Sequence, residues 1–165
     1  MSDGPLEETW EAWTSRIALD LAALTEDDWL TFTVHVASHA ASTYAAERAP
    51  RGRRRGGARS ARPAPVPDVF VQARLLAGVL ALECIGDTEF EGLTDLTRDQ
   101  QAALVGLGWA REGDEPEFSR TFGAPGGADA AEAPDAAAAL LRASLSGVLG
   151  AGSPADVDVR RAPRP

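Results

Sequence analysis

The sequence predicts an α+β fold, in which about three helices pack on a mainly antiparallel sheet of about five strands. Three observations support this prediction: apolar residues recur at helical spacing near both ends of the chain, a period of two dominates between them, and short turns join neighbouring strand-like segments. The expected order is α-β-(insertion)-β-β-α-β-β-α. Since the chain has 165 residues, we expect one domain, over about residues 5–150.

The first helix is predicted from a long apolar stripe. Pro5 suits the first helical position, and Glu7 and Glu8 suit the positive end of the helix dipole. The residues that would face the sheet recur at intervals of three and four: Leu6, Trp10, Trp13, Ile17, Leu21 and Leu24.

The first strand is predicted where this period changes to two. Leu30, Phe32, Val34 and Val36 alternate with more polar residues, which is typical of a half-buried strand. The next segment, about residues 38–67, is rich in Ala, Arg, Gly and Pro. Because its apolar content is too low to offset the entropy lost on ordering, we expect a flexible insertion.

The next two strands are expected over residues 68–76 and 78–85, as hairpin neighbours beside the first strand. In the second of them, Leu80, Leu82 and Cys84 share one face.

A second helix is predicted by its terminal signals. Thr97 and Gln100 fit a capping box, and Gly108 suits a left-handed C-terminal cap. The expected inner face of this helix consists of Ala103, Leu104 and Leu107.

The last elements are a hairpin and a helix. A strand beginning at Trp109 would pair with residues 117–122, and a helix over about residues 134–149 would direct its large apolar side chains inward, namely Leu140, Leu141, Leu145, Val148 and Leu149. We expect residues 151–165 to form a mostly disordered tail, with at most a short edge strand at 156–159.

The charge is unevenly distributed along the chain. Residues 48–62 hold seven of the 16 basic side chains and no acid, so nine arginines face 25 carboxylates elsewhere, a net charge of −16. Such a body repels phosphate and anionic lipid, and we expect no membrane partner. Nucleic-acid binding would be confined to the arginine segment, which otherwise forms a solvated loop; its candidate residues are Arg51, Arg53, Arg54, Arg55 and Arg59.

The sequence predicts no catalytic residues, metal site or cofactor. His35 and His39 are four residues apart but have no third ligand nearby, and Cys84 has leucine neighbours typical of a buried, inert thiol. The nucleophile-elbow, P-loop and dinucleotide-binding glycine motifs are absent. The start lacks the features of a signal peptide, and the apolar stretch at 75–82 is too short to span a membrane, so a cytoplasmic location is expected.

Several segments, by their order and spacing, resemble the bacterial TY-Chap family, which is related to YbjN and to type III secretion chaperones of the CesT kind. They are "WEAWTSRIALDLAAL" (10–24), "FVQA" (70–73), "LALECIGD" (80–87), "LTRDQQAALVGLGW" (96–109) with "PEFSRTF" (116–122), and "AALLRASLSGVLG" (138–150). Two features depart from the family: Asp87 stands where asparagine is usual, and the arginine-rich insertion is longer than expected.

The resemblance implies a non-enzymatic module that binds a peptide or protein client, with a homodimer as a common assembly of its relatives. The client would lie in an apolar groove beside the first helix or along a strand edge. Core packing is the competing interpretation for the two tryptophans, and a nucleic-acid-binding accessory protein is the alternative function. The candidate peptide contacts are Trp10, Trp13, Ile17, Leu21, Phe70, Gln72 and Glu83.

Overall fold

The computed structural model describes residues 7–34, 69–85, 96–111, 117–123 and 128–163. Within these ranges the predicted α+β class is confirmed, with three α-helices and a five-stranded antiparallel sheet. The insertion expected at about 38–67 lies outside them. The elements in chain order are α1 (Trp10–Ala22), β1 (Asp28–Val34), β2 (Val69–Leu76), β3 (Val79–Ile85), α3 (Arg98–Gly106), β4 (Glu117–Phe122), the 3₁₀ turn η1 (Ala128–Ala130), α4 (Ala133–Gly147), the 3₁₀ turn η2 (Pro154–Asp156) and β5 (Val157–Pro163).

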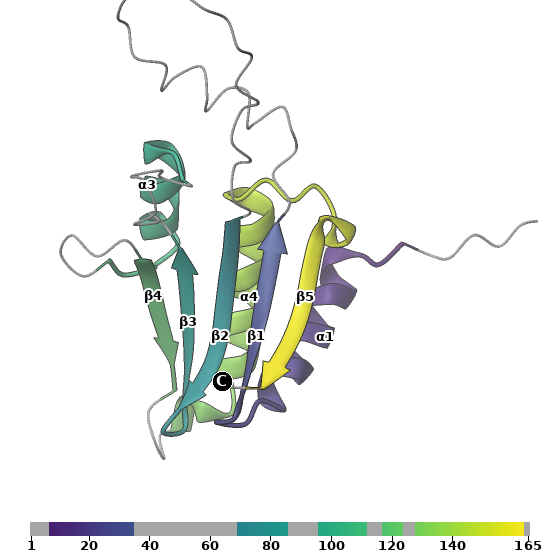
Figure 1. Ribbon diagram of the computed structural model, residues 1–165, viewed down its shortest axis with the longest axis vertical. Helices are drawn as coiled ribbons and strands as arrows, with labels where there is room; N and C mark the ends of the chain where they lie inside the picture. Colours follow the sequence, from purple (N-terminus) through teal and green to yellow (C-terminus); the bar gives the residue numbers. More distant parts are fainter. Residues whose placement is uncertain (1–6, 35–68, 86–95, 112–116, 124–127, 164–165) are drawn as a thin grey trace, which may run out of the picture.

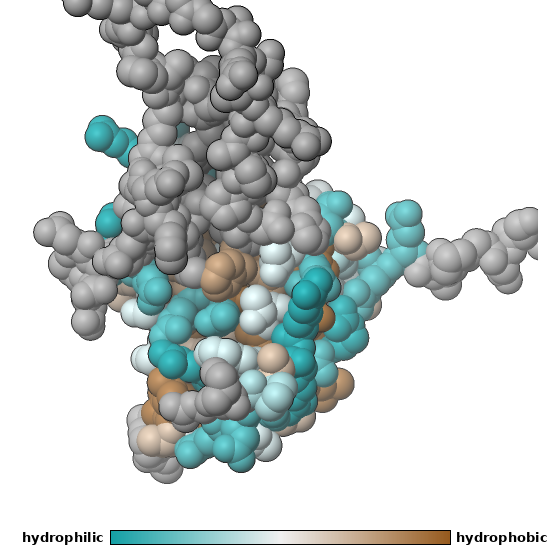
Figure 2. All heavy atoms as spheres, in the orientation of Figure 1, coloured by the Kyte–Doolittle hydropathy of each residue, from teal (hydrophilic) through white to brown (hydrophobic). Residues whose placement is uncertain are grey.

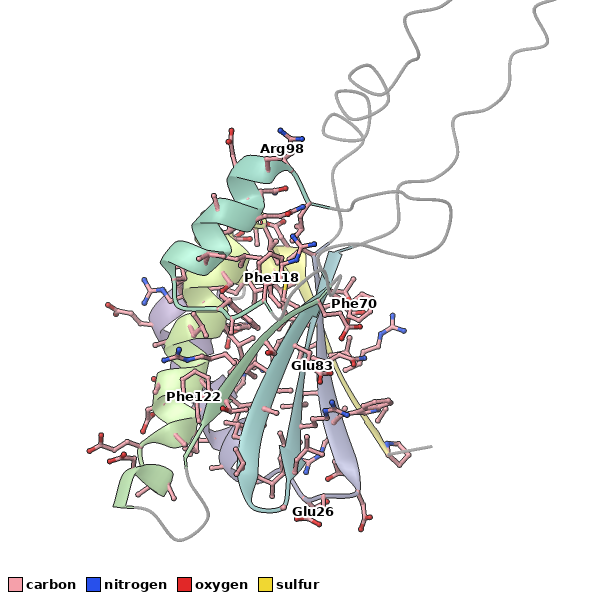
Figure 3. The ribbon with its side chains drawn as sticks, turned by 90° about the vertical axis from the view of Figure 1, so that its left-hand side faces the viewer. Glu26, Phe70, Glu83, Arg98, Phe118 and Phe122 are labelled. Atoms are coloured by element: carbon pink, nitrogen blue, oxygen red, sulfur yellow. The ribbon has the colours of Figure 1, made fainter. Side chains whose placement is uncertain are left out.

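The strands are arranged in the order β4-β3-β2-β1-β5, and all neighbours are antiparallel. Helices α1 and α4 pack against each other behind the sheet, and α3 lies beyond one end of it (Figure 1). The side view separates a helix layer from the sheet, whose other face carries no described helix (Figure 3). Within the described ranges the structure therefore has two layers, and the helices cover one face of the sheet while no described element covers the other.

The helical stripe of α1 forms the centre of the core, as predicted. Trp13, Ile17, Leu21 and Leu24 are at most 6% exposed and pack on the covered face of the sheet. The predicted start of this helix at Pro5 is wrong, because the described residues 7–9 are not helical. Thr9 forms the N-cap, and its hydroxyl oxygen accepts a hydrogen bond from the backbone N–H of Ala12 at 3.2 Å.

The predicted hairpin of β2 and β3 is confirmed, and a turn of two residues joins its strands. Ala77 and Gly78 both have positive φ values, 48° and 78°, as a type I′ turn requires. Glycine adopts this backbone conformation without steric cost, whereas Ala77 is strained there.

Helix α3 begins with the predicted capping box, in which Thr97 and Gln100 exchange hydrogen bonds of 2.9 and 3.1 Å. The predicted inner face is correct only for Leu104, since Ala103 and Leu107 are exposed. The helix lies beyond the end of the sheet, so it has only a narrow face to bury (Figure 1).

The strand predicted at Trp109 is replaced by one isolated bridge between Ala110 and Ser119. The Trp109 side chain is buried, and its indole N–H donates to the Ser144 hydroxyl at 2.9 Å; that hydroxyl donates in turn to the Leu140 carbonyl at 2.8 Å. Trp109 therefore anchors the chain to α4 instead of extending the sheet.

The fifth strand comes from the segment that was expected to be mostly disordered. β5 pairs with β1 over its whole length and buries Val157. The Arg161 guanidinium donates to the Asp28 carboxylate at 2.6 Å and to the Ala23 carbonyl at 2.7 Å. These bonds join the C-terminal strand to the turn between α1 and β1.

We expect acid to weaken this connection. The Arg161 guanidinium, followed by the Thr25 hydroxyl, lowers the pKa of Asp28 below its ordinary value of 3.8. Because the folded-state pKa is lowered, the stabilisation is present above pH 3.8 and is lost as the pH falls through the folded value. The free energy of unfolding of Asp28→Asn should therefore lie below that of the wild type at about pH 7, and the gap should shrink at about pH 3. Urea titrations at both pH values measure it; an unchanged gap would contradict the assignment.

Candidate functional site

The candidate site is the sheet face opposite α1 and α4, which we call the open face. Every second side chain of a strand points to this side, so the strand registers determine its members. Figure 2 shows a mixture of polar and apolar surface there. The described residues aligned on the open face include Trp29, Thr31, Thr33, Phe70, Gln72, Arg74, Ala81, Glu83, Ser119, Thr121, Asp158 and Arg160.

Two half-buried aromatic side chains lie on the open face, Trp29 on β1 and Phe70 on β2. Phe70 is paired with Thr33 and projects away from the helix layer (Figure 3). Strand rise and strand spacing place the Cα atoms of Trp29 and Phe70 about 14 Å apart. Partly exposed aromatic rings offer a large, rigid contact area to a partner.

A polar row crosses the sheet between these rings. Adjacent to it, a guanidinium nitrogen of Arg74 donates to the carboxylate of Glu83, and the two side chains are 35% and 27% exposed. The Nε atom of Arg74 is buried and has no hydrogen-bond acceptor among the described residues, so it is not exposed to a partner. The row itself offers hydroxyl, amide, carboxylate and guanidinium groups to a partner. Its members, one per strand, are Arg160, Thr31, Gln72, Glu83 and Ser119.

The residues expected to line a groove beside α1 are mostly inaccessible. Trp13 and Ile17 are 0% exposed and Leu21 is 3% exposed. The Trp13 ring packs edge-on against Trp10 and Phe32, with centroid distances of 5.3 and 6.1 Å. Only Trp10 is half-buried. Core packing therefore accounts for Trp13, Ile17 and Leu21, and no peptide can reach them in this conformation.

The seven predicted contacts are thus divided between two sides of the sheet. Phe70, Gln72 and Glu83 lie together on the open face, whereas the four residues of α1 lie in or against the core. The prediction missed Trp29 and Arg74. Extending the alternation of the first strand back by one residue would have placed Trp29 on the same face as Thr31 and Thr33.

Other candidate groups provide no chemistry within the described residues. Cys84 is buried, and burial raises the pKa of its thiol to about 12, so the thiol stays neutral at physiological pH. No three His, Cys, Asp or Glu side chains gather there as metal ligands. His35, His39 and the arginines of 48–62 lie outside the described residues.

The helices lie on one side of the sheet, and no described element covers the open face on the other side. A family model described as "T3SS (YopN, CesT) and YbjN peptide-binding chaperone 3" matches residues 3–163. The chain therefore belongs to this TY-Chap3 family of peptide-binding chaperones, and the resemblance noted in the sequence is confirmed.

Comparison with curated proteins and with solved structures finds no match to this chain. Among the helices of the described part of the chain, none has the length and apolar character that a membrane span requires.

Proposed function

We propose that this protein acts without catalysis and holds an extended segment of a client protein on the open face. The observation that carries the proposal is a sheet face that no described element covers, with two half-buried aromatic rings on either side of a polar row. Membership of a peptide-binding chaperone family supports binding of a peptide in general, and the geometry suggests where it binds.

The spacing of the rings selects a kind of client. Phe70 pairs with Thr33 on β1, and Thr33 lies four residues after Trp29 on that strand. An extended client with apolar side chains at positions i and i+4 would place both on the same side, one against each ring. The acidic composition outside residues 48–62 favours basic or neutral segments over acidic ones.

An array of synthetic peptides tests the proposal, with apolar residues spaced by two, three or four positions in basic, neutral and acidic backgrounds. We expect the wild type to bind best to basic or neutral peptides with i, i+4 spacing. The double variant Trp29→Ala with Phe70→Ala should weaken binding at least about 30-fold, because even one buried aromatic anchor contributes about 2 kcal/mol or more.

Leu19→Ala is the matched control, since Leu19 is an apolar side chain of α1 that is 72% exposed and lies outside the open face. It should leave peptide binding unchanged. The site is wrong if this variant and the aromatic double variant bind the peptides equally well, and the function is wrong if the wild type binds none of them.

A further inference from the structure

The middle of the open face is occupied by Thr31 and Gln72, which we call the central pair. These two residues lie opposite each other on β1 and β2. Trp29 is two residues from Thr31 along the sheet, and Phe70 is two residues from Gln72 toward the other end. The midpoint between the Cα atoms of Trp29 and Phe70 therefore falls between the central pair, about 7 Å from each aromatic residue.

The strand ladder brings the side chains of the central pair close together. Ser119 exchanges both of its backbone hydrogen bonds with Ala110, so its backbone groups point away from β3. Backbone groups in antiparallel strands alternate between neighbours. Followed through Glu83, this alternation directs the backbone of Gln72 toward β3 and that of Thr31 toward β5. The central pair is therefore a non-hydrogen-bonded pair, in which the Cα atoms are about 4.5 Å apart and the side chains approach closely.

The polar groups of the central pair are half-buried and have no partner in the described part of the chain. Neither the Thr31 hydroxyl nor the Gln72 amide forms a hydrogen bond to another described residue. Each of these groups can both donate and accept a hydrogen bond. A client that covers them without bonding to them would leave buried polar groups unpaired, which weakens binding.

The charged residues on either side of the central pair are already paired. Glu83, on the β3 side, accepts a hydrogen bond from Arg74. Arg160, on the β5 side, donates to Asp158 at 2.7 Å. One flank is acidic and the other is basic, so a charged client group above the central pair would be attracted by one flank and repelled by the other. Such a group would lose hydration without a net ionic gain.

We propose that the central pair selects an uncharged amide side chain, asparagine or glutamine, at client position i+2. This inference rests on the proposed function, in which apolar residues i and i+4 of an extended client contact the two rings. Residue i+2 of that client lies midway between them and points to the same side as both. Its amide can donate to and accept from the Thr31 hydroxyl and the Gln72 amide, whereas an aliphatic side chain there leaves both unpaired.

Four otherwise neutral peptides test this selection by isothermal titration calorimetry. All carry apolar residues at i and i+4, and they differ only in having glutamine, leucine, lysine or glutamate at i+2. We expect the wild type to bind the glutamine peptide about tenfold more tightly than the leucine peptide, because the leucine covers polar groups without bonding to them. The lysine and glutamate peptides should both bind more weakly than the glutamine peptide.

The double variant Thr31→Val with Gln72→Leu assigns the preference to the central pair. It should be folded by far-UV circular dichroism and should bind the leucine peptide at least as tightly as the glutamine peptide. If it does not fold, Thr31→Val alone, which nearly keeps the shape of the side chain, should narrow the preference. Gln101→Leu is the matched control: it makes the same substitution on α3, beyond the end of the sheet, and should keep the wild-type preference (Figure 1).

Equal affinity of the wild type for the glutamine and leucine peptides overturns this inference and leaves the proposed function intact. So does a folded double variant that keeps the wild-type preference, since another surface would then select the residue at i+2. A wild type that binds none of the four peptides contradicts the proposed function, and this inference fails with it.

Discussion

Deletion of residues 157–165 is expected to abolish cooperative folding of the chain. Val157 is 8% exposed and Val159 packs against the core, and the strand covers the flank of β1 along its whole length. Full burial of a valine stabilises by roughly 1.5–3 kcal/mol, and the partly buried Val159 contributes less than Val157. Together with the lost ladder, the deletion costs on the order of 5 kcal/mol. A domain has only about 5–15 kcal/mol in total, so thermal unfolding followed by circular dichroism should show no native transition.

The matched control removes only residues 164–165 and leaves β5 whole, so its unfolding transition should coincide with that of the full chain. The comparison separates the observed strand from the disordered tail that the sequence suggested. If the longer deletion also melted like the full chain, β5 would not be part of the folded structure.

Elements with strong periodicity or explicit terminal signals were predictable from the sequence. The α1 stripe has spacings that only one helical face satisfies, and its members Trp13 and Ile17 are fully buried. The capping box at Thr97 depends on local hydrogen bonds between neighbours, so it needs no knowledge of the tertiary structure. Strands β2, β3 and β4 lie within one residue of their predicted bounds.

The errors occur where tertiary contacts decide the structure. β5 has only two valines among charged residues and is ordered by β1, which is more than 120 residues earlier in the chain, so its sequence alone resembles a disordered tail. Trp109 follows a helix and precedes the turn-like sequence of residues 112–116, as a strand residue would, but its indole N–H bonds to Ser144 of α4. Neither partner is identifiable from local sequence.

The candidate site was predictable only in part for a similar reason. Alternation shows that Phe70, Gln72 and Glu83 share a face of the sheet, but it does not show which face the helices cover. Trp10 and Trp13 looked suitable for a client because an aromatic stripe on a helix fits both a core and a groove. The arrangement of α1 and α4 on one side decides between these interpretations.

Trp13→Ala is expected to destabilise the protein by about 3–5 kcal/mol, since it removes a large, fully buried side chain that packs against Trp10 and Phe32. Urea unfolding followed by far-UV circular dichroism measures this loss without relying on tryptophan fluorescence. A peptide anchor on an accessible groove would behave differently, because its removal would weaken client binding and leave the free energy of unfolding nearly unchanged.

Two further variants show whether volume or polarity matters at this position. Trp13→Phe should cost only about 1 kcal/mol, because it keeps most of the ring and removes an indole N–H that has no acceptor among the described residues. Trp10→Ala, at the half-buried neighbour, should cost clearly less than Trp13→Ala. If Trp13→Ala were instead as stable as Trp10→Ala, the seam between α1 and the sheet would be open in solution, and the helix would again be a candidate for holding the client.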